Sequence, residues 1–529
     1  MAQSVFTALL AGRPEARSLL PGRFEDPEEW TRAADRAAAS RVPGPVMEEM
    51  VRQSRALPLS EARTRMLEKL THPGATVVVT GQQVGLFGGP LYTLHKAATA
   101  IARARWIEER VRRPCVPVFW LQTEDHDYPE IANVTVQART EPMTLALPPD
   151  PHPSRVSIAH RTVPEQVDAV LAEAEAALSP LPHAAEVLAL LRAHYVPGRP
   201  MASAFAGLMA ELWQAEGLVV LDPRVPAVAR SAAPLFQRVL REHAALASVL
   251  GARAAEIERI GCDVQVPSRP EASLVFFHPA RADGPRYRLV RRDDGFETPE
   301  GPVSIPTLEN VLEREPLRFS SSALLRPLVQ DSILPTCAYV GGPAEVSYFA
   351  ELPPLYEHLG LPLPLVAPRA RLRLLDAPTR SLLERLGLAA ADVETSRDAL
   401  LARVAIRPDG AGTLAELEAR LLGPLRRELD ALAALGVHNL EGPIQKTRDA
   451  CTEAVGRLAS KVERALLERD QATLGRVERV QAALYPAGVP QERAYGFLTL
   501  AARSGTAALT RVILAGAESF DPRVGDIPL

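Results

Sequence analysis

The stretch TVVVTGQQVGLFGGPLYTLHK, residues 76–96, decides the fold. Its first five residues are mostly β-branched, which is typical of a buried strand. A loop with four glycines and a closing proline follows at 81–90, and the apolar spacing over 91–112 predicts a helix. A second apolar run at 116–120 completes a βαβ unit, whose strands should be parallel and joined by a right-handed crossover. The sequence therefore predicts an α/β fold.

Further strands are predicted on the C-terminal side of this unit. Short apolar runs at 218–221 and 336–340 are typical of buried strands, and the second should rejoin the main sheet. Residues 274–278 and 287–290 alternate in polarity. With the Asp-Gly turn signal at 294–295, they predict an antiparallel hairpin. The proline-rich segment that precedes these runs, from Glu141 to Pro164, is expected to loop across a surface.

A leucine-rich region near the C-terminus predicts two long helices. From about residue 411, leucines recur every three or four positions over 414–435, and a turn signal follows at 436–443. A second helical pattern runs to about Leu484. These features predict an antiparallel helical hairpin that projects from the body and offers a dimer surface. The alternative is that the hairpin folds back on the body.

We divide the chain into five parts on these patterns. The first part of the core covers 1–140, a connecting insertion 141–270, and the continued core with its β-hairpin insertion 271–380. The helical coiled-coil domain covers 381–485, and 486–529 returns to the core.

Composition and charge exclude several classes of protein. At 529 residues the chain is too long for one ordinary core, and its 47% hydrophobic and 23% charged residues are average for a globular protein. Sixty basic against 64 acidic residues leave a net charge of −4, which gives no basic field for nucleic acid. No apolar run reaches the ~18 residues of a membrane helix. Four scattered cysteines without a Cys-x-x-Cys pair fit a reducing cytoplasm.

The glycine loop is the first of three candidate ligand-binding segments. In a parallel sheet, ligands collect beyond the carboxyl ends of the strands, which is where this loop lies. Gln82, Gln83 and Gly85 favour hydrogen bonding to a neutral, hydroxylated ligand, and Lys96 is one of only four lysines. The spacing matches neither a dinucleotide-binding loop nor a phosphate-binding P-loop. A strand-to-helix turn without a ligand is the alternative.

The second candidate segment follows the strand at 116–120. It holds Glu124, Asp125, His126 and Asp127 in succession. Crowded carboxylates beside an imidazole can hold an ammonium group or deprotonate an attacking amine. A metal site is the rival interpretation, because His and Asp bind several divalent ions. A cluster that caps the next helix would account for one or two of the acids.

The third candidate segment joins two polar stretches around the predicted strand at 336–340. Arg326 can clamp a carboxylate with two hydrogen bonds, and Glu345 should lie at an exposed helix start. For each of these residues a structural salt bridge is the alternative. The members of this segment that we propose to contact substrate are Arg326, Gln330, Asp331, Gly342, Glu345 and Tyr348.

Together these segments resemble the bacillithiol-synthesis cysteine ligase family. The matching motifs, in order, are Thr80-Gly81-Gln82-Gln83-x-Gly85-Leu86-x-x-Gly89-Pro90-Leu91-Tyr92-Thr93-x-x-Lys96, Val118-Phe119-Trp120 with Thr123-Glu124-Asp125-His126-Asp127, Arg326-Pro327 with Gln330-Asp331, Gly341-Gly342-Pro343-x-Glu345-x-x-Tyr348, and Pro490-Gln491-Glu492-Arg493. They span more than 400 residues, so the resemblance covers nearly the whole chain. At Ser321-Ser322 the chain departs from the proline-asparagine or similar pair that many relatives carry.

The resemblance implies a Rossmann-like core with connecting insertions and a projecting coiled coil through which the chain forms a homodimer. It implies a cytoplasmic enzyme that joins L-cysteine to glucosaminyl-malate through an amide, the last step of bacillithiol synthesis. Such a bond needs an activated carboxyl group, as an adenylate or acyl phosphate, so the chemistry implies ATP although no nucleotide motif is present. We predict no metal site, nucleic-acid partner or membrane contact.

The implied roles distribute over the three segments. Gln82, Gln83 and Gly85 would bind the sugar–malate or the nucleotide, and Lys96 and Arg326 would meet carboxylate or phosphate charge. The four residues from Glu124 to Asp127 would be catalytic: Asp125, His126 and Asp127 would orient and deprotonate the amine. Contacts to the nucleotide are assigned to Gly81, Gly88, Gly89 and His95.

Two other classes of function remain open on the sequence. The acidic cluster would also suit a metal-dependent hydrolase or deacetylase of a glucosamine conjugate. The helical hairpin would also suit a non-catalytic dimeric adaptor, in which the polar loops have no chemical role.

Overall fold

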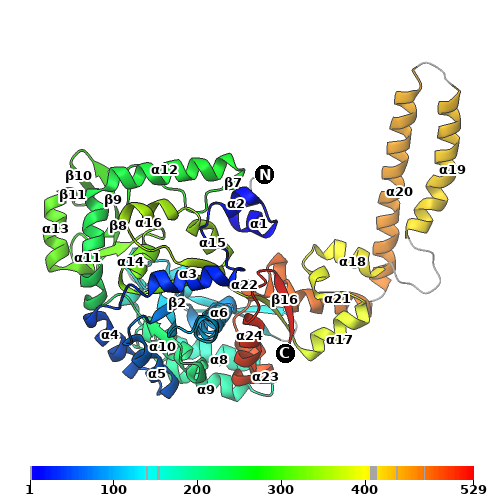
Figure 1. Ribbon diagram of the computed structural model, residues 1–529. Coiled ribbons are helices and arrows are strands. Elements are labelled where there is room, and N and C mark those ends of the chain that lie inside the picture. The colour runs from blue at the N-terminus through cyan, green and yellow to red at the C-terminus, as the bar shows by residue number, and fades with distance from the viewer. Residues whose placement is uncertain (1–2, 139–140, 152–154, 406–413, 436–438, 470) are drawn as a thin grey trace.

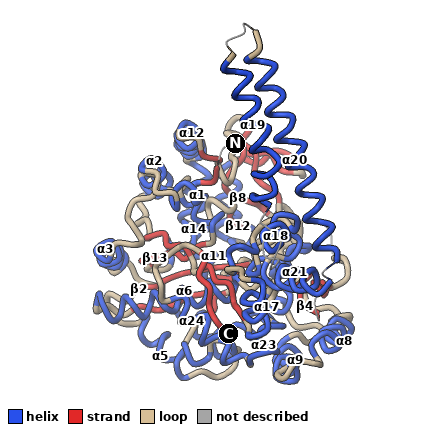
Figure 2. The backbone as a smooth tube through the Cα atoms, turned by 90° about the vertical axis from the view of Figure 1, so that its right-hand side faces the viewer, coloured by secondary structure: helices blue, strands red, loops and turns tan. Residues whose placement is uncertain are grey.

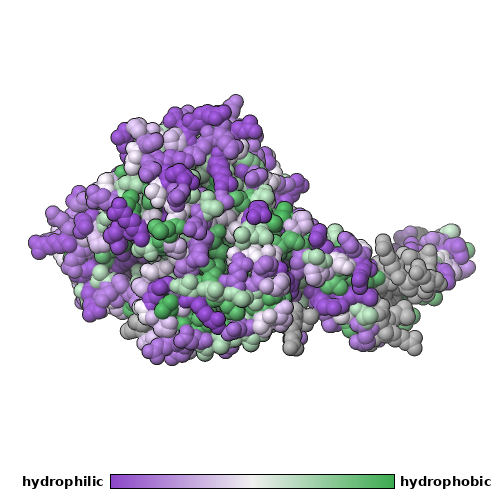
Figure 3. Space-filling model, turned by 90° about the horizontal axis from the view of Figure 1, so that it is seen from below, coloured by the Kyte–Doolittle hydropathy of each residue, from purple (hydrophilic) through white to green (hydrophobic). Residues whose placement is uncertain are grey.

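The computed structural model describes residues 3–138, 141–151, 155–405, 414–435, 439–469 and 471–529. A rounded α/β body carries two long helices that extend away from it (Figure 1). Hydrophilic and hydrophobic residues are interspersed on the face of the body seen from below (Figure 3). Among the described residues, no helix is long and apolar enough to cross a membrane.

The centre of the body is a sheet of five parallel strands in the order β14-β13-β2-β3-β6. Each strand is short and almost fully buried, as expected for a parallel sheet covered on both faces. Helix α6 (Tyr92–Trp106) connects β2 to β3, which confirms the predicted βαβ unit. The strand bounds are β2 Thr76–Gln82, β3 Cys115–Leu121, β6 Val219–Leu221, β13 Thr336–Gly341 and β14 Leu365–Pro368.

Helices cover both faces of this sheet because side chains along a strand alternate between its faces. Val77 and Val79 of β2 pack in one core with helices α4, α5, α11 and α14. Val78, between them, packs on the opposite face with α3 and α6. The helix bounds are α3 Pro27–Ala37, α4 Gly44–Arg55, α5 Glu61–Leu70, α11 Pro226–Arg241 and α14 Arg326–Ile333.

A second, antiparallel sheet flanks the first, with the strand order β11-β10-β9-β8-β12. Strands β8 and β9 pair as predicted, but residues 278–286 connect them. The predicted turn lies one strand later, because Asp293 and Asp294 join β9 to β10. The bounds are β8 Ala272–Phe277, β9 Tyr287–Arg292, β10 Gly295–Thr298, β11 Gly301–Ser304 and β12 Phe319–Ser321.

The start of the proline-rich segment forms a strand, so the prediction of a surface loop is wrong there. Strand β5 (Glu141–Ala146) pairs antiparallel with β4 (Asn133–Ala138). Leu145 of β5 is fully buried, which supplies a packing face that Pro142 had obscured. Pro142 is tolerated because β5 has only one neighbour in its two-stranded sheet.

The two long helices form the predicted antiparallel hairpin. Helices α19 (Leu414–Ala434) and α20 (Glu441–Arg469) lie side by side and point away from the body, as Figures 1 and 2 show. Arg448 of α20 pairs with Asp430 of α19 at 2.5 Å. The hairpin therefore does not fold back on the body. At its base, α20 contacts helices α18 (Arg397–Ala405) and α21 (Gln471–Leu484), which form a separate core with α17 (Ala377–Leu386).

The C-terminal segment returns to the body and reaches the carboxyl edge of the main sheet. Strand β16 (Val524–Pro528) pairs in parallel with β15 (Arg371–Leu375), and helix α24 (Thr506–Ala517) packs on α6. In the short helix α22 (Gln491–Ala494), the Gln491 side chain bonds both backbone polar groups of Leu374. This contact fixes the two residues that follow, Glu492 and Arg493, beside the main sheet.

Candidate functional site

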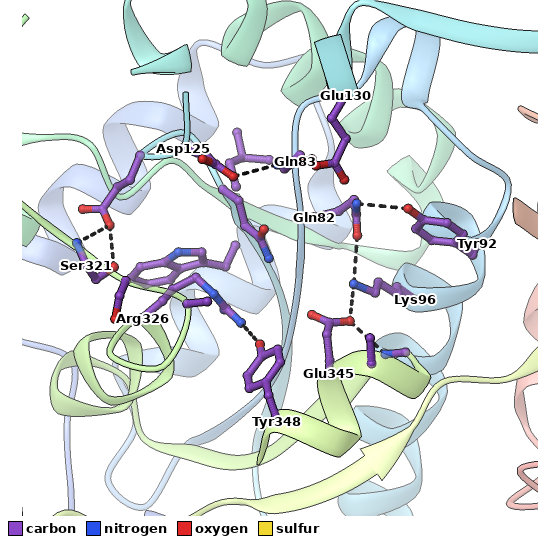
Figure 4. Close-up of a pocket in the computed structure, with 18 of the residues that line it drawn as sticks. Gln82, Gln83, Tyr92, Lys96, Asp125, Glu130, Ser321, Arg326, Glu345 and Tyr348 are labelled. Carbon is purple, nitrogen blue, oxygen red and sulfur yellow. Dashed lines mark hydrogen bonds and ion pairs between the residues drawn. The ribbon is translucent and has the colours of Figure 1, made fainter. Parts of the chain in front are cut away.

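A pocket of about 360 Å³ opens at the carboxyl ends of β2, β3 and β13 (Figure 4). It is the edge of the sheet at which the sequence predicts a site. Of the predicted residues, the pocket is lined by Gln82, Gln83, Lys96, Glu124, Asp125, Arg326, Gly342, Glu345 and Tyr348. The structure thus brings together residues from all three candidate segments.

Lys96 is the centre of the pocket wall formed by β2 and α6. Its side chain is 3% exposed and its Nζ donates to the Gly81 carbonyl at 2.8 Å and to Gln82 Oε1 at 2.9 Å. It also forms an ion pair with Glu345 (Figure 4). Burial lowers the pKa of Lys96, and Glu345 counteracts part of that shift. Lys96 therefore ties β2 to the segment that follows β13.

Glu345, on helix α15 (Pro343–Phe349), is held by several donors at once. Its carboxylate accepts hydrogen bonds from the Tyr339 hydroxyl at 2.6 Å and the Gly342 N–H at 2.8 Å, in addition to the Lys96 contact. Burial works to raise the pKa of Glu345, but Lys96, Arg326 and the Gly342 N–H together hold it below its ordinary value. Glu345 is therefore an ionised, fully engaged carboxylate.

Arg326, at the start of α14, is a buried guanidinium that keeps hydrogen-bonding capacity. It is 9% exposed, and its Nη2 donates to the hydroxyls of Tyr339, at 3.2 Å, and Tyr348. Among the described residues, its Nη1 has no hydrogen-bond partner and no carboxylate lies within ion-pair distance. A buried guanidinium without a carboxylate partner favours the binding of an anionic ligand.

Glu124 links the loop after β3 to the antiparallel sheet. One of its carboxylate oxygens accepts from the Ser321 N–H at 3.0 Å and from the Ser321 hydroxyl at 2.6 Å. Ser321 ends strand β12, so this pair closes the pocket between the two sheets (Figure 4). Ser321 therefore supplies two hydrogen bonds to Glu124.

Asp125 is bound from three sides. Gln83 Nε2 donates to it at 2.8 Å, the His126 N–H at 2.7 Å, and Arg286 Nη2 at 3.3 Å. Arg286 is 5% exposed and also donates to His126 Nδ1 at 3.2 Å. Burial and the Arg286 charge lower the pKa of His126, which favours its neutral form.

The C-terminal segment supplies the remaining wall. Glu492 accepts two hydrogen bonds from Arg369, at 2.6 and 2.7 Å, and a contact from His95 Nδ1 at 3.2 Å. Burial works to raise the pKa of Glu492, but Arg369 and His95 hold it well below its usual range. Arg369 and Arg493 also face the ring of Tyr92, at 5.2 and 5.7 Å from its centre.

Several predicted residues lie outside the pocket lining. His95 is fully buried behind the wall against Glu492, and Gln330 and Asp331 bond to each other at 2.9 Å in the core. Burial raises the pKa of Asp331 to about 6, although the Tyr356 hydroxyl donates to it. His126 does not line the pocket, and Asp127 is exposed and caps α7 (Tyr128–Ile131).

The predicted glycines of the first loop, Gly81, Gly85, Gly88 and Gly89, shape that loop and do not line the pocket. A Cβ on Gly85 would lie 2.8 Å from the Gly89 Cα, and one on Gly81 would lie 2.8 Å from the Trp120 carbonyl oxygen. Gly88 adopts φ +89°, and its N–H donates to the Tyr195 hydroxyl at 3.2 Å. These contacts explain the glycines by close backbone packing.

Sequence reasoning missed about half of the lining. Arg369 follows the end of β14 directly, so the rule that located the other loops could have found it. Arg286 lies at the entry to β9 in the antiparallel sheet, and no local pattern marks it. The lining residues not assigned a role from the sequence are Tyr92, Trp120, Leu121, Gln122, Glu130, Arg286, Ser321, Ser322, Ala323, Pro343, Ala344, Arg369 and Arg493.

The charges of the pocket nearly balance. Five cationic side chains and four carboxylates line it, which suits a ligand that carries both signs of charge. Glu124, Asp125 and Glu345 are bound to separate partners, as described above. Among the residues that the structure describes, no three His, Cys, Asp or Glu side chains are placed to share a metal ion.

The chain is similar to proteins of bacillithiol synthesis over most of its length. Residues 1–370 match the family model described as "Bacillithiol biosynthesis BshC, N-terminal Rossmann-like domain". Residues 373–520 match "Bacillithiol biosynthesis BshC, C-terminal coiled-coil domain".

Curated relatives named "Putative cysteine ligase BshC" match at similar levels. The protein from Heliobacterium modesticaldum is 32% identical over 474 residues, 86% of this chain and 83% of the relative. That from Salinibacter ruber is 32% identical over 491 residues, 89% and 88% of the two chains. That from Koribacter versatilis is 33% identical over 443 residues, 82% and 80% of the two chains.

Proposed function

Because this chain belongs to the BshC family of bacillithiol biosynthesis, we propose that it joins the carboxyl group of L-cysteine to the amine of glucosaminyl-malate. The observation that carries this proposal is Arg326, a buried guanidinium in the pocket with an N–H free for a ligand. Both proposed substrates carry carboxylate groups, and both carry an amine that is protonated near neutral pH. The nearly balanced charges of the pocket suit such molecules.

ATP is the proposed co-substrate, because a free carboxylate does not form an amide in water without activation. A nucleotidyl or phosphoryl group from ATP would convert the cysteine carboxyl group to an adenylate or an acyl phosphate. Arg326 fits either phosphate or carboxylate charge, since its Nη1 is buried without a partner. Lys96 would act through Gln82 and Glu345, whose positions it fixes.

The acids of the second loop would orient the amine substrate. Glu124 and Asp125 line the pocket, and each is held in place by hydrogen-bond donors. Such fixed carboxylates can hold an ammonium group in one position. His126 and Asp127 would act only through Asp125 and through the cap of α7.

The test of this function is the direct detection of the product. Purified protein is incubated with cysteine, glucosaminyl-malate and ATP, and the products are separated and weighed by mass spectrometry. We expect one product whose mass equals the masses of cysteine and glucosaminyl-malate together, less the mass of one water molecule. A hydrolase would instead cleave a glucosamine conjugate, and a non-catalytic adaptor would change neither substrate. Neither the matched family nor the relatives indicate these two functions.

We also propose that the helical hairpin forms a homodimer. Leu421, Leu432, Leu435 and Leu458 leave 45–67% of their surface exposed on α19, its C-terminal end and α20, although leucine-rich coiled coils normally bury such side chains. Light scattering should give about twice the chain mass of 57.3 kDa. Leu432→Glu with Leu435→Glu should give the monomer mass. Leu59→Glu, at a leucine on the body that is 88% exposed, should leave the dimer intact.

A cytoplasmic location is part of the same proposal. All four cysteines are free thiols, and three of them are buried. Buried free thiols are typical of proteins that function in a reducing compartment.

A further inference from the structure

Glu130 lines the pocket, but none of the roles proposed above involves its carboxyl group. It lies on the short helix α7, directly after the acidic loop, and its carboxyl group points toward Gln82 and Gln83 (Figure 4). The residue lines the pocket and is exposed to solvent. It therefore faces any ligand that enters between α7 and the wall formed by β2 and α6.

The four pocket carboxylates differ in how their oxygens are occupied. Glu124 is bound by Ser321, Asp125 by Gln83 and Arg286, and Glu345 by Lys96 with Tyr339 and Gly342. These donors fix the position of all three carboxyl groups, which suits them to holding a charged group of a ligand in one place.

Glu130 has the opposite surroundings. Among the described residues no cation lies within ion-pair distance of its carboxyl group, since the pocket cations Lys96 and Arg286 pair with Glu345 and Asp125. Desolvation in the pocket raises the pKa of Glu130; the Gln83 side chain opposes the shift, Asp127 and Asp125 add to it, and Lys96 opposes it. Tyr92 on α6 faces the same space. A carboxylate with a raised pKa in a pocket is a better proton acceptor at neutral pH.

We propose that Glu130 is the general base that deprotonates the attacking amine of the substrate. This inference rests on the proposed ligase function. The ammonium group of the sugar gives one proton to the Glu130 carboxylate, and the freed nitrogen lone pair forms the C–N bond at the activated cysteine carbonyl. When the carbonyl re-forms, the C–O bond to the phosphoryl leaving group breaks with its electron pair. The second nitrogen-bound proton departs with that leaving group.

The test is Glu130→Gln, which keeps the shape of the side chain and removes its basicity. At neutral pH, kcat for bacillithiol formation should fall about 100-fold or more, the usual size of general-base catalysis, while KM for each substrate stays within about threefold. Glu173→Gln, at an exposed residue of α8 (Val167–Leu178) far from the lining, should behave as the wild type.

Two further readouts separate a base from a structural residue. Raising the pH should restore the rate of Glu130→Gln relative to the wild type, because solution base then deprotonates the amine. With hydroxylamine in place of the sugar, an amine already unprotonated at neutral pH, the variant should form cysteine hydroxamate at the wild-type rate.

Three outcomes are decisive. A Glu130→Gln kcat within about threefold of the wild type, with the same pH profile, overturns the assignment. An equal loss with glucosaminyl-malate and with hydroxylamine overturns it as well, since a base would be needed for the first only. A wild-type protein that forms no amide contradicts the ligase function itself, which is a different result from either.

Discussion

Replacement of Lys96 by methionine is expected to lower both the stability and the activity of the protein. The substitution leaves the Glu345 carboxylate buried without its cation and frees the Gly81 carbonyl and Gln82 Oε1. Removing one partner of a buried ion pair costs about 3–5 kcal/mol, because the remaining charge stays out of water. We expect a clear fall in the thermal unfolding midpoint and a loss of about 100-fold in kcat/KM.

A matched pair of variants separates the two effects. In Lys96→Met with Glu345→Gln, no buried charge is left alone, so most of the thermal stability should return while the activity stays low. Lys69→Met removes a lysine whose ion pair with Glu108 is partly exposed, and partly exposed pairs contribute about 1 kcal/mol or less. If Lys69→Met were as harmful as Lys96→Met, or if the double variant regained full activity, the role given to Lys96 would be wrong.

Replacement of Arg326 by lysine is expected to weaken substrate binding while it keeps the positive charge. The planar guanidinium of Arg326 donates to Tyr339 and Tyr348 through Nη2 and keeps Nη1 for the ligand. The ammonium group of lysine cannot make both sets of contacts. A charge-assisted hydrogen bond contributes about 1.5–3 kcal/mol, so KM for the substrate that Arg326 binds should rise about 10- to 150-fold. Steady-state kinetics with each substrate varied in turn measures this effect.

The control for this variant is another buried arginine. Arg253 donates to the backbone carbonyl of Ala350 and forms an ion pair with Glu256, away from the pocket. Arg253→Lys should lower the thermal midpoint without a change in any KM. An Arg326→Lys variant with lower stability and unchanged KM values would show that Arg326 is a structural residue.

The central part of the fold could be predicted from local patterns. The β-branched run at 76–80 and the helix that starts at Tyr92 lie within one βαβ unit, so their pairing needs only short-range rules. The leucine spacing over 414–435 likewise predicts the helical hairpin. Strand β5 was missed because Pro142 obscures an alternation that becomes visible only when Leu145 is packed. The five-part division of the chain stays a prediction.

The pocket was predictable where it follows strand ends and unpredictable where distant segments meet. Lys96, Asp125 and Glu345 follow β2, β3 and β13, and the parallel sheet brings them to one edge. Arg286 reaches the pocket from another sheet, and its position depends on how the two sheets pack. His95 lies outside the lining because a helix turns by about 100° per residue, so its neighbour Lys96 faces the pocket and His95 faces the core. The chemical roles themselves stay proposals.

The measurement that tests the ligase proposal most directly is nucleotide consumption by the purified protein. Cysteine and glucosaminyl-malate are supplied separately and together with ATP, and AMP, ADP and bacillithiol are quantified in the same samples. We expect ATP to be consumed only when cysteine and glucosaminyl-malate are both present. One AMP or one ADP should form for each bacillithiol molecule. Nucleotide consumption without amide formation, or no consumption with both substrates present, would contradict the proposed function.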